Sequence, residues 1–76
     1  MGLSPMSKHR VYHIIPHHDG GWAVTETDAP LPLIAFHSKD AAVAFAESLA
    51  EGSRPSTLIV HNRDKTVERE AEYREN

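Results

Sequence analysis

The residues of this chain with the widest chemical range are its histidines, and most of them lie in or beside predicted strands. A neutral imidazole is a common ligand of zinc, copper and nickel. His17 and His18 adjoin Asp19, and His61 ends a strand that could lie beside the first one. A site built across two hairpins is therefore conceivable, with His17 and His61 as its weak candidates. The histidines found in or next to predicted strands are His13, His17, His18, His37 and His61.

The spacing of these histidines argues against a metal centre. The chain has no cysteine and no His-x-x-x-His pattern on a helix, which are the spacings that most strongly indicate a metal site. His17 and His18 are adjacent, so on extended backbone their side chains point to opposite sides. We therefore predict no bound metal and no cofactor, and we interpret these histidines as turn and strand-end residues, with His13 half-buried.

Signals for catalysis are weaker still. A serine nucleophile needs a base and an orienting acid in a concave site. Ser38 is better explained as a helix cap, and Ser53 and Ser56 as loop residues. A chain of 76 residues has little room for a pocket of about 300 Å³ or more. We predict that the protein is not an enzyme.

Composition limits the classes of protein to which the chain can belong. Seventy-six residues make at most one domain, and a net charge of −3 argues against phosphate-backbone binding as the main activity. The sequence has neither the roughly 20 apolar residues needed to cross a bilayer nor the apolar core of a signal peptide. We expect a cytoplasmic protein without membrane contact, with a flexible arm over residues 1–9, one domain over residues 10–73 and a frayed tail over residues 74–76.

The elements that must position these side chains begin with a hairpin. Residues 10–16 are rich in β-branched and aromatic types, and residues 22–26 continue as a returning strand. Asp19, Gly20 and Gly21 between them are strong turn signals, since glycine accepts a positive φ. Residues 33–37 are predicted to form a short third strand or only an extended lead-in.

The second half of the chain predicts a helix followed by another hairpin. Ser38 is a favoured N-cap, and the alanine-rich run that follows is expected to end at Gly52. Residues 55–62 form a predicted strand, and residues 66–73 are interpreted as a last strand, although a helix is the rival for residues 67–74. The predicted fold class is α+β in two layers, a small antiparallel sheet with a single helix on one face.

Two of the predicted strands, residues 10–16 and 55–62, are apolar on both faces. Tyr12 and Ile14 alternate with Val11 and Ile15, whereas a single helix covers only one face of a sheet. Two explanations stay open: loops and the C-terminal segment cover the second face, or a second copy of the chain does so by two-fold symmetry.

Three segments together are similar to a known family. They are the stretch from Tyr12 to Val24 with its Gly21-Trp22 pair, the Ser38-Lys39-Asp40-Ala41-Ala42 helix start, and the stretch from Leu58 to Val67. They resemble a family of very small bacterial proteins known only as a domain of unknown function. The chain departs from that family at Lys65, where the family pattern places glycine, so the type of the second turn is open. The resemblance implies the hairpin–helix–hairpin order and no activity.

These observations favour a non-enzymatic interaction module that forms a homodimer through its sheet and binds an unidentified protein partner. The alternative is a small nucleic-acid-binding protein that stacks bases on sheet aromatics, which the negative charge disfavours. The candidate interface residues are Tyr12, Ile14, Trp22, Val24 and Tyr73. The candidate nucleic-acid contacts are Lys8, Arg10, Arg63, Lys65 and Arg69.

Overall fold

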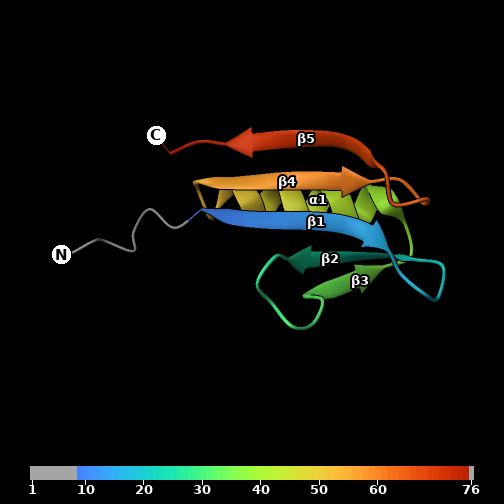
Figure 1. Cartoon of the computed structure of the whole chain (residues 1–76). Coiled ribbons are helices and arrows are strands. Elements are labelled where there is room, and N and C mark those ends of the chain that lie inside the picture. Colours follow the sequence, from blue (N-terminus) through green and yellow to red (C-terminus); the bar gives the residue numbers. More distant parts are fainter. Residues whose placement is uncertain (1–8, 76) are drawn as a thin grey trace.

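A computed structural model describes residues 9–75 and contains one helix and a mixed sheet of five strands (Figure 1). The strands are β1 (Arg10–Pro16), β2 (Trp22–Glu26), β3 (Ile34–Phe36), β4 (Ser56–His61) and β5 (Val67–Tyr73), and the helix is α1 (Lys39–Glu51). The α+β class, the single helix and the strand character of residues 67–73 are confirmed. The predicted arm of residues 1–9 lies outside the described residues except for His9.

The sheet has the order β3-β2-β1-β4-β5, and its central pair is parallel. The predicted purely antiparallel sheet is therefore corrected to a mixed one. The two hairpins are antiparallel as expected, but β1 and β4 are joined through β2, β3 and α1 rather than through a turn. The chain reverses direction at each of these elements, so it enters β4 in the same direction as β1.

The ends of α1 follow from its capping residues. The Ser38 hydroxyl accepts a hydrogen bond from the Ala41 amide at 3.0 Å, and Asp40 lies in the first turn, where the helix dipole favours an anion. At the other end the Gly52 amide donates to the Ser48 carbonyl at 3.1 Å. None of the described residues belongs to a helix that is long and apolar enough to cross a membrane.

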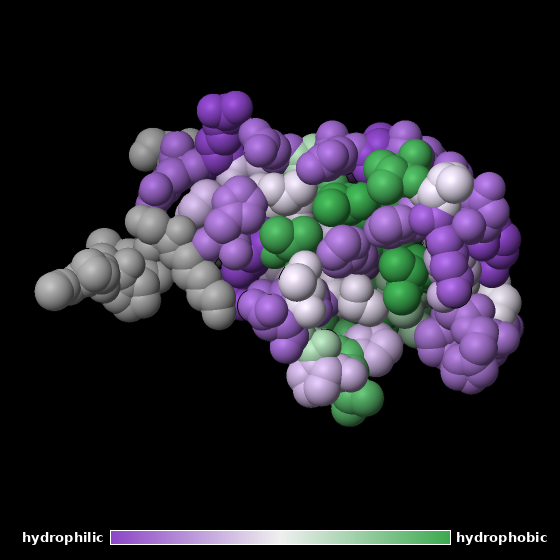
Figure 2. Space-filling view, viewed as in Figure 1, coloured by the Kyte–Doolittle hydropathy of each residue, from purple (hydrophilic) through white to green (hydrophobic). Residues whose placement is uncertain are grey.

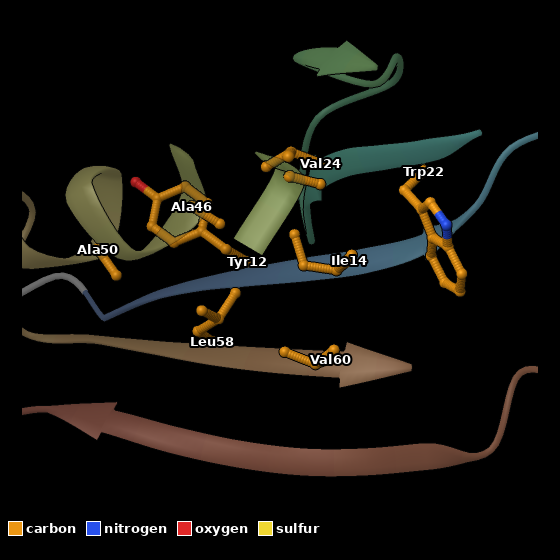
Figure 3. Packing of buried hydrophobic residues seen from close by; sticks show 9 residues of the cluster. Tyr12, Ile14, Trp22, Val24, Ala46, Ala50, Leu58 and Val60 are labelled. Atoms are coloured by element: carbon orange, nitrogen blue, oxygen red, sulfur yellow. The ribbon is translucent and has the colours of Figure 1, made fainter. Parts of the chain in front are cut away.

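The core lies between α1 and one face of the sheet (Figure 3). The helix contributes Ala42, Ala46 and Ala50, all fully buried, and these small side chains let its backbone approach the strands closely. The strands supply the larger apolar groups of the core, which are Tyr12, Ile14, Trp22, Val24, Leu58 and Val60.

Each of the two turns that follow β1 and β4 has one residue with a positive φ. In the first turn Gly20 has a φ of 96°, and a Cβ on Gly21 would lie 2.4 Å from the Phe36 carbonyl oxygen. In the second turn Lys65 has a φ of 77°, in the left-handed region that favours glycine. The position where the chain departs from the family pattern is therefore one whose backbone suits the family's glycine.

Candidate functional site

Four of the five residues predicted to form an interface lie in the core of the chain. Tyr12, Ile14, Trp22 and Val24 are at most 8% exposed and pack beneath the helix. Tyr73 is partly buried at the rim of this core, with the Arg54 guanidinium 5.7 Å from its ring centre. Any surface that meets a partner would therefore be built from other residues.

The face of the sheet opposite the helix, which we call the open face, carries the alternate residues of each strand. Figure 1 shows α1 behind β1 and β4, so the open face is turned toward the viewer. Figure 2, from the same side, shows apolar side chains among hydrophilic ones over these strands. The strand registers place on this face Val11, His13, Ile15, Ala23, Thr25, Ala35, Thr57, Ile59, His61, Glu70 and Glu72. Val11, Ile15 and Ile59 are half-buried, so part of each apolar side chain stays in contact with solvent.

Two histidines meet in the middle of the open face. His13 is aligned with Ile59 in the parallel β1–β4 register, so His61 lies two residues further along β4 and on the same face. The Nδ1 atom of His13 is 3.1 Å from the Nε2 atom of His61, and the two rings are stacked with their centres 5.3 Å apart. Sequence reasoning missed this pairing because it depends on a parallel register that no turn signals.

The outer nitrogens of the pair also have partners. The Nδ1 atom of His61 is 3.2 Å from the Lys65 carbonyl oxygen, which can only accept, so this nitrogen carries a hydrogen. His13 Nε2 is 3.2 Å from the Thr27 hydroxyl, which lies 3.4 Å from the Val11 carbonyl oxygen. Burial, and then the neighbouring charge of His61, lower the pKa of His13 below its ordinary value, so His13 stays neutral to lower pH.

The weak metal candidates His17 and His61 have different partners. His17 lies in the first turn, where its Nδ1 is 2.7 Å from an Asp19 carboxylate oxygen and its ring is 4.3 Å from that of His18. The Asp19 carboxylate also accepts the Gly21 amide at 3.0 Å, and these two hydrogen bonds lower the pKa of Asp19. Within residues 9–75 no three acidic, histidine or cysteine side chains group together as metal ligands would.

The basic residues considered for nucleic-acid binding do not form a common patch. Arg10 pairs with Glu26 at 3.0 Å, and Arg69 with Glu47 at 3.3 Å. Lys65 belongs to the second turn, and Lys8 lies outside the described residues. The acidic partners of Arg10 and Arg69 weaken the attraction of these two side chains for a phosphate backbone.

Arg63 has a structural contact of its own. It donates to the Gly20 carbonyl at 3.0 Å and places its guanidinium 4.4 Å from the Trp22 ring centre. The Lys39 ammonium lies 4.9 Å from the same ring centre, so two cations contact a tryptophan that is only 8% exposed. Trp22 is therefore held in the fold rather than presented to a base.

A shallow pocket of about 380 Å³ lies at the other end of the sheet, between His9, Pro55 and Tyr73. Ser56 also lines it, but the Ser56 hydroxyl is buried and donates to the Ala50 carbonyl at 2.7 Å. The ring of His9 is hydrogen-bonded to the Thr57 hydroxyl at 2.7 Å. No serine–histidine contact is present among the described residues that line this pocket.

Comparison with known proteins shows which family this chain is similar to. A family model described as an uncharacterized protein conserved in bacteria (DUF2188) matches residues 12–73. The chain is also 35% identical, over 63 residues, to the uncharacterized protein YycD of Bacillus subtilis (strain 168), covering 82% of this chain and 94% of that protein. No solved structure matches the chain significantly.

Proposed function

We propose that this chain, which belongs to the DUF2188 family of uncharacterized bacterial proteins, is a non-enzymatic interaction module that pairs with a second copy of itself through the open face. The observation that carries the proposal is the set of half-buried apolar side chains, Val11, Ile15 and Ile59, on the face that α1 does not cover. A small domain has a thin margin of stability, and covering a second apolar face is one way to increase it.

The area of the open face limits how tightly two copies of the chain can bind each other. Five strands about 4.8 Å apart, each with about six residues at 3.3 Å, give a face of roughly 480 Å². Two such faces bury about 960 Å² in total, close to the lower limit of about 1,000 Å² for specific interfaces. We therefore expect a weak, reversible dimer rather than an obligate one.

The charges on the open face select how two copies can meet. Glu70 and Glu72 lie on β5 at one side of the face, whereas β2 and β3 at the other side carry Ala23 and Ala35. A two-fold axis parallel to the strands places the β5 of one copy over β2 and β3 of the other. The acidic side chains of the two copies then stay apart, while an axis across the strands would bring them together at a cost in free energy.

The edges of the sheet are poorer contacts than its face. The β3 edge has only three residues, and the β5 edge alternates charged side chains through Glu68, Arg69 and Glu70. Short and charged edge strands discourage the addition of another strand. A dimer formed by joining sheets edge to edge is therefore disfavoured.

Sedimentation velocity over a range of concentrations tests the proposal. The wild-type chain should shift from monomer to dimer below about 1 mM, the range of the weakest specific contacts. Ile59→Lys should remain monomeric throughout, because a charge would be buried in the middle of the interface. The matched control is Leu31→Lys, since Leu31 is 73% exposed in a loop, and it should associate like the wild type. A wild-type chain that stays monomeric over the whole range contradicts the proposal.

A further inference from the structure

The geometry points to a two-histidine binding site for a divalent transition-metal ion, Cu²⁺ or Zn²⁺, between His13 Nδ1 and His61 Nε2 on the open face. The two nitrogens belong to residues on adjacent strands in the middle of the sheet, so the backbone of β1 and β4 holds the two side chains next to each other. Both ligands come from one chain, so the site does not require a second copy.

The distance between the two nitrogens suits two ligands of one ion. With a metal–nitrogen distance of about 2.05 Å, two ligands lie about 2.9 Å apart at a right angle and about 3.3 Å apart at the tetrahedral angle. The observed separation of His13 Nδ1 and His61 Nε2 is 3.1 Å, between these two values. Both rings must turn so that their lone pairs converge on the ion beside the line that joins the two nitrogens.

The outer partners of the two rings are those expected of metal-binding histidines. Such a histidine usually donates its other N–H to a carbonyl or another oxygen, which fixes the tautomer and the ring orientation. His61 Nδ1 donates to the Lys65 carbonyl, which leaves a lone pair on Nε2. His13 Nε2 faces the Thr27 hydroxyl, whose own hydrogen can point to the Val11 carbonyl.

The hydrogen-bond chain can change from the metal-free to the metal-bound arrangement without gaining or losing a proton. Without metal, His13 Nδ1–H donates to His61 Nε2, and the Thr27 hydroxyl donates to His13 Nε2. With metal, the ion would lie beside the line between the two nitrogens, at about 2.05 Å from each, and the proton that had been between the rings moves to His13 Nε2. The Thr27 hydroxyl then accepts from His13 Nε2–H and turns its own hydrogen to the Val11 carbonyl.

The surroundings of the pair favour a cation and limit its affinity. Glu70 is aligned with Ile59, the residue that lies beside His13, so a carboxylate is on the same face of the neighbouring strand. The described residues supply only these two histidine ligands, and water completes the coordination. Imidazole ligands and the order of stability of divalent ions favour Cu²⁺ over Zn²⁺, and both over Mg²⁺.

Titration calorimetry on the full chain without an affinity tag, in dilute solution, tests the site with copper, zinc and magnesium chlorides. We expect one Cu²⁺ per chain, weaker binding of Zn²⁺ and none of Mg²⁺. His61→Gln and His13→Gln should each weaken Cu²⁺ binding at least tenfold. The matched control His18→Gln, in the exposed first turn, should bind as the wild type does. Absence of Cu²⁺ binding, or binding lost in His18→Gln but kept in His61→Gln, would overturn the inference.

A second measurement on the unchanged chain covers the case in which a variant does not fold. Electron paramagnetic resonance of the Cu²⁺ complex should show hyperfine coupling to two imidazole nitrogens, whereas coupling to one or none contradicts the site. Thr27→Val removes the outer partner of His13 but no ligand, and it should weaken Cu²⁺ about tenfold or more while keeping both nitrogens. Sedimentation at the same concentrations shows separately whether the chain dimerises, so the two proposals can fail independently.

Discussion

Two neighbouring residues of β4 offer a sharp measurement of how differently the two faces of the sheet are covered. Leu58 points into the core and is 0% exposed, whereas Ile59 points to the open face and is half-buried. Because they are adjacent on the same strand, Leu58→Ala and Ile59→Ala change the same part of the fold. The difference between their costs in free energy of unfolding measures what each face contacts.

The expected magnitudes follow from burial. A fully buried leucine shortened to alanine loses about 2.7–5 kcal/mol, because a cavity is added to the lost transfer free energy. For a chain of 76 residues the whole free energy of unfolding is about 4–11 kcal/mol, so Leu58→Ala should remove a large part of it. Full burial of an isoleucine side chain is worth about 1.5–3 kcal/mol, so losing the half-buried Ile59 should cost about 1 kcal/mol in the monomer.

Urea unfolding followed by the fluorescence of Trp22, the chain's one tryptophan, provides the measurement. In dilute protein Ile59→Ala should be several-fold less costly than Leu58→Ala, and its cost should rise with concentration if the open face pairs. Ile59→Thr, which keeps a β-branched side chain, is the control for strand propensity. If Ile59→Ala costs as much as Leu58→Ala in dilute protein, the open face is covered within the chain and our reasoning is refuted.

Two further predictions concern the second turn and the rim of the core. Lys65→Gly should raise the free energy of unfolding by about 0.5–1 kcal/mol in the same urea assay, because Lys65 has a φ of 77° and glycine adopts this conformation without a Cβ penalty; Lys65→Ala, which keeps a Cβ, should show no such gain. Burial, and then the charges of Glu47 and Glu51, raise the pKa of Tyr73 above its ordinary 10.0, so the folded chain holds the phenol proton more tightly than the unfolded chain. This contribution to the free energy of unfolding is fully present below pH 10.0 and is lost as the pH rises through the folded pKa. The free energy of unfolding of Tyr73→Phe should therefore fall less steeply with alkaline pH than that of the wild type, and phenolate absorbance of the wild type should show a late-titrating tyrosine. Equal slopes of the free energy of unfolding against pH in both proteins would contradict this.

The elements of the fold were predictable because each has a local signal. β-Branched runs mark β1 and β4, Gly20 and Gly21 mark the first turn, and Ser38 marks the start of the helix. The direction of β4 relative to β1 has no local signal, since about forty residues and three other elements separate the two strands. For this reason the predicted antiparallel sheet was wrong at its central pair, which is parallel.

The candidate site was harder to predict than the elements. Alternation along β1 shows that Tyr12 and Ile14 share one face and Val11 and Ile15 the other, but both sets are apolar. Only the packing of α1 decides which set becomes core, and it covers Tyr12 and Ile14. The contact between His13 and His61 depends on the parallel register and on this choice of face together, so neither histidine could be assigned its partner from spacing.

The parallel pairing of β1 with β4 also has a consequence for how the chain folds. Tyr12 is aligned with Leu58. The two middle strands can therefore pair only after the segment between them has been synthesised and its two ends have come together. Contacts between residues so distant in sequence slow folding, and the first hairpin alone has no helix and no β4 to cover Tyr12 and Ile14. During synthesis the apolar side of β1 therefore stays exposed until α1, which follows the first hairpin and packs on that side, has emerged.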